Sequence, residues 1–264
     1  MYEFDYQRPA SVDDAVKIGG GDARFLAGGQ SLVQSMRLRL ASAPTLVDLG
    51  AIPDLRFIKV DGNTVTIGAM TTHATVARSA EVIAAIPALA ELAGGIGDPM
   101  VRNLGTIGGS VANADPAACY PSAVLALNAT IKTNQRTIAA DDFFRGLFET
   151  ALQPGEMIVS ISFPVVKQAS YQKLRQPASR FALVGVFVAN GPGGPRVAVT
   201  GAASHVFRVT EMETALKSSF APDAIANVKV SPAGLNGDMH GSAEYRAAMI
   251  TVLAQRGVAA ALAR

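Results

Sequence analysis

The chain has 264 residues, 49% of them hydrophobic, and its 23 Lys and Arg residues nearly balance its 21 Asp and Glu residues. This indicates a globular protein with one large domain or two modest ones and argues against a disordered chain. The net charge of +2 gives no reason to expect nucleic acid or an anionic membrane as a partner. No apolar run reaches the roughly 18 residues that span a bilayer. The N-terminus MYEFDYQRP lacks a signal-peptide pattern, so we expect a cytoplasmic protein.

Metal and disulfide chemistry have little support in the sequence. Cys119 is the single cysteine, so it forms no internal disulfide and cannot supply the ligands of an iron–sulfur cluster. His73, His205 and His240 are not spaced as metal ligands, and each is interpreted as a packed or surface residue. We therefore expect no metal site on this chain and no side-chain acid, base or nucleophile that is essential for catalysis.

The first 54 residues alternate helix and strand signals. Ser11, followed by acidic residues, predicts the N-cap of a short helix that ends at the glycines 19–21. Residues 24–27 and 46–49 are interpreted as short strands, and Ser31 is expected to cap a second helix that reaches Leu40. This alternation predicts a small parallel sheet.

The pattern changes near residue 55, where alternation around Asp61-Gly62 predicts a β-hairpin. Residues 74–95 are rich in alanine and are interrupted by Pro87, which predicts two helical pieces. The apolar stretch 121–127 predicts a buried helix, and the alternation over 159–163 predicts a half-exposed strand.

A third pattern begins at about residue 166. The continuous apolar run 181–189 predicts a central strand, NGPGGP at 190–195 a turn, and 196–202 a returning strand. Helices are predicted over 210–217 and 242–261. The second of these carries an apolar stripe of Tyr245, Met249, Val252 and Leu253.

Two glycine pairs carry the functional hypothesis. Gly28-Gly29 lies between a predicted strand and a predicted helix, and Gly108-Gly109 lies within GTIGGSVANADP. Glycine lets backbone N–H groups approach a ligand closely, so the two pairs predict a grip on both sides of one diphosphate. With so little positive charge, backbone amides and the hydroxyls of Ser31, Thr106 and Ser110 would hold it. The alternative is two ordinary tight turns, since neither pair matches G-x-G-x-x-G or the Lys-containing phosphate loop.

Longer motifs resemble those of one family. AGGQSL (27–32), LVDLGAIPDL (46–55) and VRNLGTIGGSVANADPAA (101–118) occur in the order and spacing of its members. The family is that of the FAD-binding medium subunits of molybdenum hydroxylases, the carbon-monoxide dehydrogenase and xanthine dehydrogenase group. The resemblance extends over nearly the whole chain through GEMIVSISFP (155–164), YQKLRQPASRFALV (171–184) and DMHGSAEYR (238–246).

The resemblance implies an α+β fold. A FAD-binding domain of the vanillyl-alcohol-oxidase (PCMH) type is expected over residues 1–165, with a small α/β subdomain at about 1–54 and a larger antiparallel subdomain at 55–165. A C-terminal medium-subunit domain with a three-stranded sheet and helices is expected over residues 166–264. These limits agree with the changes of pattern near residues 55 and 166.

The resemblance also implies the cofactor contacts. The segment 26–33 is expected to surround the FAD diphosphate, and 106–110 to meet it from the other side. Ile96 matches an apolar or aromatic contact, Ile158 a backbone contact near the adenine, and Lys173 a lysine that approaches from the C-terminal domain. The alternatives are core packing for Ile96 and Ile158 and a solvated charge for Lys173. The expected cofactor-binding residues are Leu26, Ala27, Gly28, Gly29, Gln30, Ser31, Leu32, Val33, Ile96, Thr106, Ile107, Gly108, Gly109, Ser110, Ile158 and Lys173.

One departure from the family pattern falls at Cys119, where relatives usually carry an acidic residue. In relatives that carboxylate can accept a hydrogen bond from a ribose or ribityl hydroxyl, whereas a thiol is a weak acceptor. Asp115 or a backbone carbonyl takes over the contact, or the contact is lost. Cys119 is expected near the cofactor but not as a ligand.

The implied function is electron transfer as the flavoprotein component of an oxidoreductase. Electrons would pass from 2Fe–2S clusters on a small partner subunit to FAD on this chain, and a large partner subunit would carry the molybdenum cofactor. A dimer of heterotrimers is the expected assembly. The acceptor is left open among a quinone, NAD, a cytochrome and oxygen. Two alternatives are a stand-alone flavin oxidoreductase of the same fold and a non-enzymatic assembly subunit.

Overall fold

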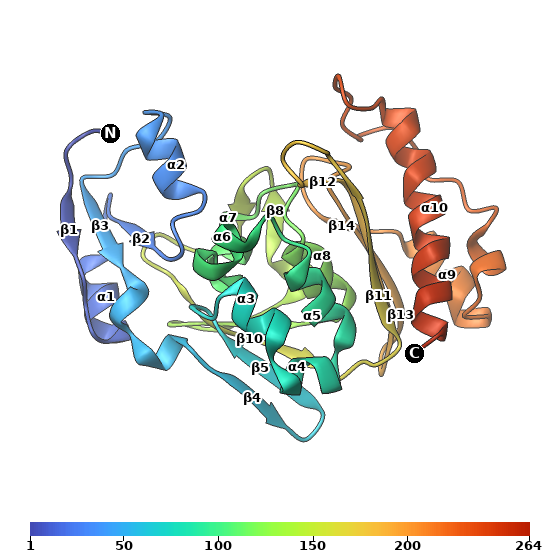
Figure 1. Ribbon diagram of the computed structural model, residues 1–264, viewed down its shortest axis with the longest axis horizontal. Helices are drawn as coiled ribbons and strands as arrows, with labels where there is room; N and C mark the ends of the chain where they lie inside the picture. Colours follow the sequence, from blue (N-terminus) through green and yellow to red (C-terminus); the bar gives the residue numbers. More distant parts are fainter.

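Three main sheets follow one another along the chain and lie in the same order across the molecule (Figure 1). The computed structural model describes all residues, 1–264. One main sheet falls within each of the predicted segments 1–54, 55–165 and 166–264. A small two-stranded sheet is added by β8 (Phe144–Gly146) and β9 (Glu149–Thr150).

The N-terminal sheet is parallel, as the alternation of helix and strand signals predicts. Its order is β1 (Asp5–Gln7), β3 (Thr45–Asp48) and β2 (Arg24–Leu26). Helix α1 (Val12–Ile18) begins where the hydroxyl of Ser11 accepts the N–H of Asp14, which confirms the predicted cap.

Helix α2 (Leu32–Arg37) also follows the predicted position, but two details of that prediction were wrong. The hydroxyl of Ser31 makes no capping hydrogen bond, although Ser31 occupies the N-cap position. The helix ends at Arg37, and Leu40 lies beyond it with its side chain in solvent.

The central sheet is antiparallel and has five strands. Its order is β4 (Ile58–Asp61), β5 (Thr64–Gly68), β10 (Ile158–Pro164), β6 (Thr130–Thr133) and β7 (Thr137–Ala139). The predicted hairpin at Asp61-Gly62 is confirmed, since Asp61 pairs with Thr64 and Gly62 has a φ of +54°. Four single 3-10 turns lie in the connections of the chain: Leu49–Ala51, Pro53–Leu55, Ala140–Asp142 and Pro222–Ile225.

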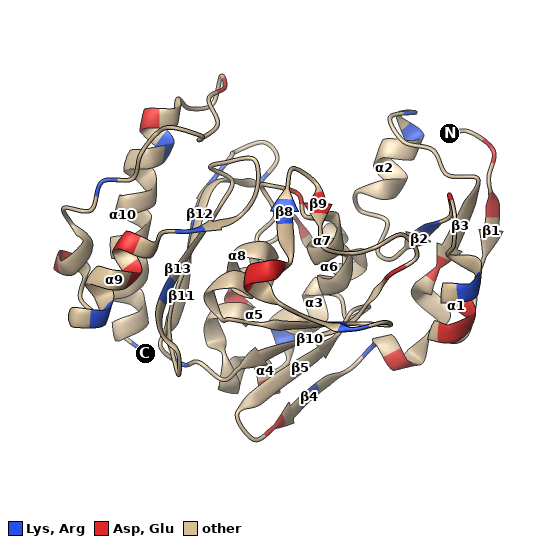
Figure 2. Cartoon of the chain, turned by 180° about the vertical axis from the view of Figure 1, so that it is seen from behind, with Lys and Arg blue, Asp and Glu red and all other residues tan.

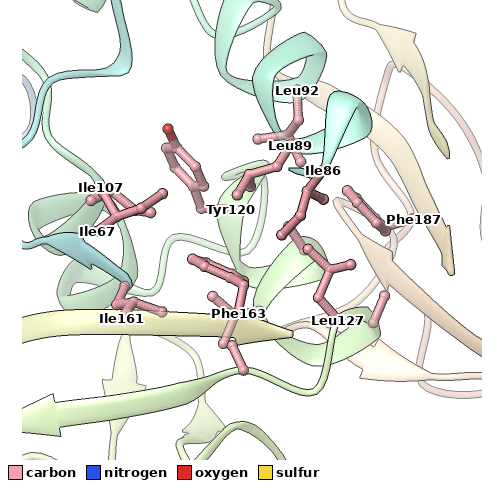
Figure 3. Close-up of a cluster of buried hydrophobic side chains, with 14 of the residues drawn as sticks. Ile67, Ile86, Leu89, Leu92, Ile107, Tyr120, Leu127, Ile161, Phe163 and Phe187 are labelled. Atoms are coloured by element: carbon pink, nitrogen blue, oxygen red, sulfur yellow. The ribbon is translucent and has the colours of Figure 1, made fainter. Parts of the chain in front are cut away.

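Six helices connect β5 to β6 and cover the central sheet. They are α3 (His73–Arg78), α4 (Ala80–Ala85), α5 (Pro87–Gly94), α6 (Pro99–Leu104), α7 (Ile107–Asn113) and α8 (Tyr120–Ala126). Two helical pieces were predicted over 74–95, and this was wrong because the hydroxyl of Ser79 caps α4 and divides the first piece. Apolar side chains from these helices meet those of β5 and β10 in the main core (Figure 3).

The C-terminal sheet is antiparallel, with the order β11 (Ala169–Arg175), β12 (Ala182–Gly191), β13 (Gly194–Thr200) and β14 (Phe207–Arg208). It has the three long strands that the resemblance implied and a two-residue strand at its edge. Helices α9 (Thr210–Ser218) and α10 (Ala243–Leu262) cover its outer face, and α5 and α8 lie against its inner face (Figure 1). Because both faces are covered, β12 is buried on both sides, which explains its continuous apolar sequence.

The predicted apolar stripe of α10 was right only in part. Leu253 is buried in the core and Met249 packs against it, but Tyr245 is 45% exposed. The buried face also includes Ile250, Val258 and several alanine and glycine residues. Small residues let the helix axis approach the sheet closely, and a Cβ added at Gly257 would lie 3.0 Å from Val188 Cγ2. Small residues therefore share the packing face of this helix with Ile250, Leu253 and Val258.

Charged residues of both signs are distributed over all three parts of the chain (Figure 2). None of the helices combines the length and the apolar character required to cross a lipid bilayer.

Candidate FAD-binding site

A cavity of about 1300 Å³ is lined by residues from all three sequence segments. Its walls come from the β2–α2 connection, from α6 and α7, from the turn before β10, and from β11 with the loop that follows it. The volume exceeds the ~300–1,000 Å³ of ordinary small-molecule sites and suits a long ligand such as a dinucleotide.

Most of the residues predicted from the sequence line this cavity. They are Leu26 to Leu32, Ile96, Thr106, Gly108 to Ser110, Ile158 and Lys173. Val33 and Ile107 do not. Val33 packs against the glycine loop, since a Cβ added at Gly29 would lie 3.0 Å from Val33 Cγ2. Ile107 is fully buried in the main core.

The two glycine segments touch each other at the edge of the cavity. A Cβ added at Gly28 would lie 2.2 Å from the carbonyl oxygen of Leu104 and 2.7 Å from Gly105 Cα. A Cβ added at Gly109 would lie 3.2 Å from Ala27 Cβ. Segments 80 residues apart in the chain are thus in backbone contact, and only glycine at position 28 permits that approach.

The first glycine segment presents a run of unused hydrogen-bond donors. The backbone N–H groups of residues 28–32 donate to no acceptor within the protein. The side chain of Gln30 donates to the carbonyl of Gly28 at 3.1 Å, and Gly29 has a φ of +70°, so the loop is folded tightly. Consecutive backbone amides in such a turn form a concave surface that attracts anions. The segment therefore suits a diphosphate.

A substitution at Gly29 tests this surface poorly. A residue with a Cβ is strained at φ +70°, so Gly29→Val would distort the loop whether or not a phosphate lies there. A loss of FAD from that variant would follow either from the distorted loop or from a Cβ in the place of a phosphate oxygen, and the experiment would not separate the two causes.

The second glycine segment plays a different part from the one predicted. Gly108-Gly109 lies within α7 and not at a corner. Its amides are already bonded: Ile107 N–H to Thr71 O, Gly108 N–H to Ala69 O, Gly109 N–H to Thr106 Oγ1 and Ser110 N–H to Thr106 O. The prediction that both pairs offer free amides is therefore wrong for this pair. Gly108 serves close packing, since a Cβ there would lie 2.5 Å from Ala69 Cβ.

Lys173 and Cys119 come together at the wall that β11 contributes. The ammonium of Lys173 lies 3.3 Å from the carbonyl oxygen of Gly95 and 3.3 Å from Cys119 Sγ. Lys173 makes no ion pair with any carboxylate. Asp115 also lines the cavity, and its carboxylate accepts the N–H of Ala117 at 2.8 Å. Lys173 is thus half-buried, and its ammonium lines the cavity without a carboxylate partner.

The structure adds cavity residues that the sequence did not single out. His73 is 5% exposed and lines the cavity, although a lone histidine was interpreted as packed or on the surface. Phe181 was placed at the start of the central strand, but β12 begins at Ala182 and Phe181 is 49% exposed at the cavity wall. Neither position carries a local sequence signal, because both reach the cavity only through the tertiary fold.

The stability of the FAD-free protein is expected to fall between pH 6.5 and pH 4. Burial, with a further contribution from the Arg102 guanidinium, lowers the pKa of His73 from 6.5 to about 4. As the pH falls, the unfolded chain therefore binds a proton at this residue before the folded chain does, and unfolding becomes more favourable. The difference corresponds to about 3 kcal/mol. Thermal melts at a series of pH values measure this slope.

The control for that slope is His73→Gln, which does not titrate in this range. Its melting temperature should depend much less on pH between 6.5 and 4 than that of the unmodified chain. Equal slopes in the two proteins would show that His73 is not the group responsible.

The fold and the run of free amides define a dinucleotide-binding protein. Residues 2–166 match the family model described as the FAD binding domain in molybdopterin dehydrogenase. The chain is 36% identical over 280 residues to the carbon monoxide dehydrogenase medium chain of Hydrogenophaga pseudoflava, covering 99% of this chain and 98% of that one. It is 34% identical to the nicotine 6-hydroxylase medium subunit of Paenarthrobacter nicotinovorans, covering 98% and 97%.

A solved structure shows the same likeness in three dimensions. The reconstituted carbon monoxide dehydrogenase from Oligotropha carboxidovorans matches with a TM-score of 0.91 at 34% identity, covering 100% of this chain and 99% of that one. The chain belongs to the family of FAD-binding medium subunits of molybdenum hydroxylases.

Proposed function

We propose that this chain is the subunit that holds FAD and passes electrons through it in a heteromeric molybdenum hydroxylase. The observation that carries the proposal is the run of free amides at residues 28–32, which lie at a cavity whose volume is large enough for a dinucleotide. FAD accepts electrons singly and releases them in pairs, while the protein supplies position and electrostatics. The chain's own residues then bind and orient the cofactor and exclude water from it.

The residues divide by the part of the cofactor they would hold. The amides of 28–32, with the hydroxyls of Ser31 and Ser110, would bind the diphosphate. Thr106 to Gly109 would close the other side largely by packing, because the amides of Ile107 to Gly109 are engaged. Ile96 would provide an apolar wall, and Ile158, whose side chain is buried in the core, would provide a backbone contact near the adenine. The ammonium of Lys173 would meet a polar or anionic edge of FAD.

The proposed domain limits assign each of the three main sheets to one domain. The proposed FAD-binding domain, 1–165, contains the parallel and the central sheets, and the proposed C-terminal domain, 166–264, contains the third. Lys173 and Phe181 would then reach the cofactor from the second domain.

The proposed partners are a large molybdenum-cofactor subunit and a small 2Fe–2S subunit, in a cytoplasmic dimer of heterotrimers. The single cysteine of this chain cannot hold a cluster, so clusters would reside on another chain. Large apolar side chains that stay exposed support a covering partner: Leu38, Leu40, Met100 and Leu104 are 71%, 79%, 74% and 57% exposed. Two relatives act on carbon monoxide and on nicotine by their names, which fits a substrate site on a different subunit.

The test is native mass spectrometry of the complex purified from cells that produce it. We expect one FAD per copy of this chain together with two further kinds of chain, one carrying 2Fe–2S clusters. FAD on a chain that purifies alone would support the stand-alone flavin oxidoreductase. Partner chains without any flavin would support the assembly subunit, and either result would contradict the proposal.

A further inference from the structure

His73 stands at the junction between the two glycine segments. It is the first residue of α3, and its backbone N–H donates to the carbonyl of Gly105 at 2.9 Å. Thr72, just before it, forms a bridge with Thr106. The backbone around His73 is therefore fixed to the second glycine segment, and the imidazole packs against the ring of Tyr120, with ring centres 5.3 Å apart.

The two ring nitrogens of His73 have different surroundings. Nδ1 is sealed in the interior without a hydrogen-bond partner. Nε2 is not sealed in this way and lies on the side of Gly105, where an added Cβ would come within 2.6 Å of it; His73 and Gly105 both line the cavity. Gly105 is in turn the residue against which Gly28 packs. The Nε2 edge of the ring therefore reaches the cavity close to the start of the free amides.

The position of the single proton follows from these surroundings. Burial and the nearby Arg102 guanidinium keep the imidazole neutral at physiological pH, so it carries one N–H. A proton on Nδ1 would be a buried donor without an acceptor, which is costly. A proton on Nε2 leaves only a lone pair in the interior and turns the donor toward the cavity.

We propose that His73 is a further binding residue for FAD, with its Nε2–H donating a hydrogen bond to an oxygen of the diphosphate or ribityl part of the cofactor. The inference rests on the proposed function of the cavity. In this proposal His73, which lies on α3, donates to the same cofactor as the amides of 28–32.

Three variants of the full, FAD-free chain test the proposal through FAD affinity, measured by quenching of flavin fluorescence. The amide nitrogen of Gln can occupy the place of Nε2, that of Asn the place of Nδ1, and Leu has no donor. We expect His73→Gln to bind FAD within about 3-fold of the unmodified chain. We expect His73→Asn and His73→Leu to bind about 10- to 100-fold more weakly, the loss of one hydrogen bond to a charged or strongly polar acceptor.

A second measurement does not depend on the folding of any variant. Long-range proton–nitrogen NMR of the unmodified chain should show the Nε2–H form of His73, with a change at Nε2 when FAD is added. The Nδ1–H form, or equal FAD affinity in all three variants, would overturn the proposal. Failure of the unmodified chain to bind FAD would instead contradict the assignment of the cavity.

Discussion

Gly28→Ala is expected to weaken FAD binding by more than 100-fold and to lower the free energy of unfolding by about 1–3 kcal/mol. The added Cβ would lie 2.2 Å from the carbonyl oxygen of Leu104 and 2.7 Å from Gly105 Cα. Both are backbone atoms, so no side-chain rotation relieves the overlap. The loop 26–32 must move away from the second glycine segment, and its free amides move with it.

The matched control is Gly20→Ala, in the turn after α1. Gly20 has ordinary φ, and an added Cβ there would meet no atom within 4 Å. FAD titration and denaturant unfolding of both variants should separate them clearly. If Gly28→Ala bound FAD as tightly as Gly20→Ala, the contact between the two segments would not matter for the cofactor.

Arg246→Met is expected to destabilise the protein by about 3 kcal/mol, the largest effect we anticipate away from the cavity. The Arg246 side chain is 3% exposed, and its Nη1 donates to the carbonyls of Leu183 at 2.7 Å and Gly201 at 3.0 Å. Nη2 forms an ion pair with Asp238 at 2.7 Å. Removing the guanidinium leaves two carbonyl groups without this donor, and methionine cannot replace it.

Arg256→Met, on the same helix, is the control. Arg256 is exposed and takes part in no ion pair, so its replacement should change the free energy of unfolding by no more than about 0.5 kcal/mol. Urea unfolding followed by circular dichroism compares the two. Equal stabilities would mean that the buried guanidinium does not hold the C-terminal sheet to α10.

Local signals in the sequence predicted the elements that depend on local chemistry. Ser11 caps α1, Asp61-Gly62 turns the first hairpin, and the apolar run forms, from Ala182 onward, a strand buried on both faces. Each of these follows from a few neighbouring residues. Arg246 shows what local signals do not predict. It lies within the motif 238–246, but the carbonyls that it binds, those of Leu183 and Gly201, are far away in the chain, so the sequence does not reveal its buried hydrogen bonds.

The candidate site was predicted only in part, for a related reason. The glycine pairs were visible, but whether their amides are free depends on neighbours from other segments. Ala69 and Thr71 occupy those of Gly108 and Ile107, and nothing occupies those of 28–32. His73 and Phe181 reach the cavity through the packing of separate elements, which no spacing in the sequence reveals.

The most direct test of this account follows the backbone amides while FAD is added. In nitrogen-15 NMR spectra of the labelled, FAD-free chain, the amides of 28–32 should shift strongly on binding because they gain an acceptor. Those of Ile107 to Ser110 should shift less because they are already bonded within the protein. Tight FAD binding with unchanged amides at 28–32 would contradict the account.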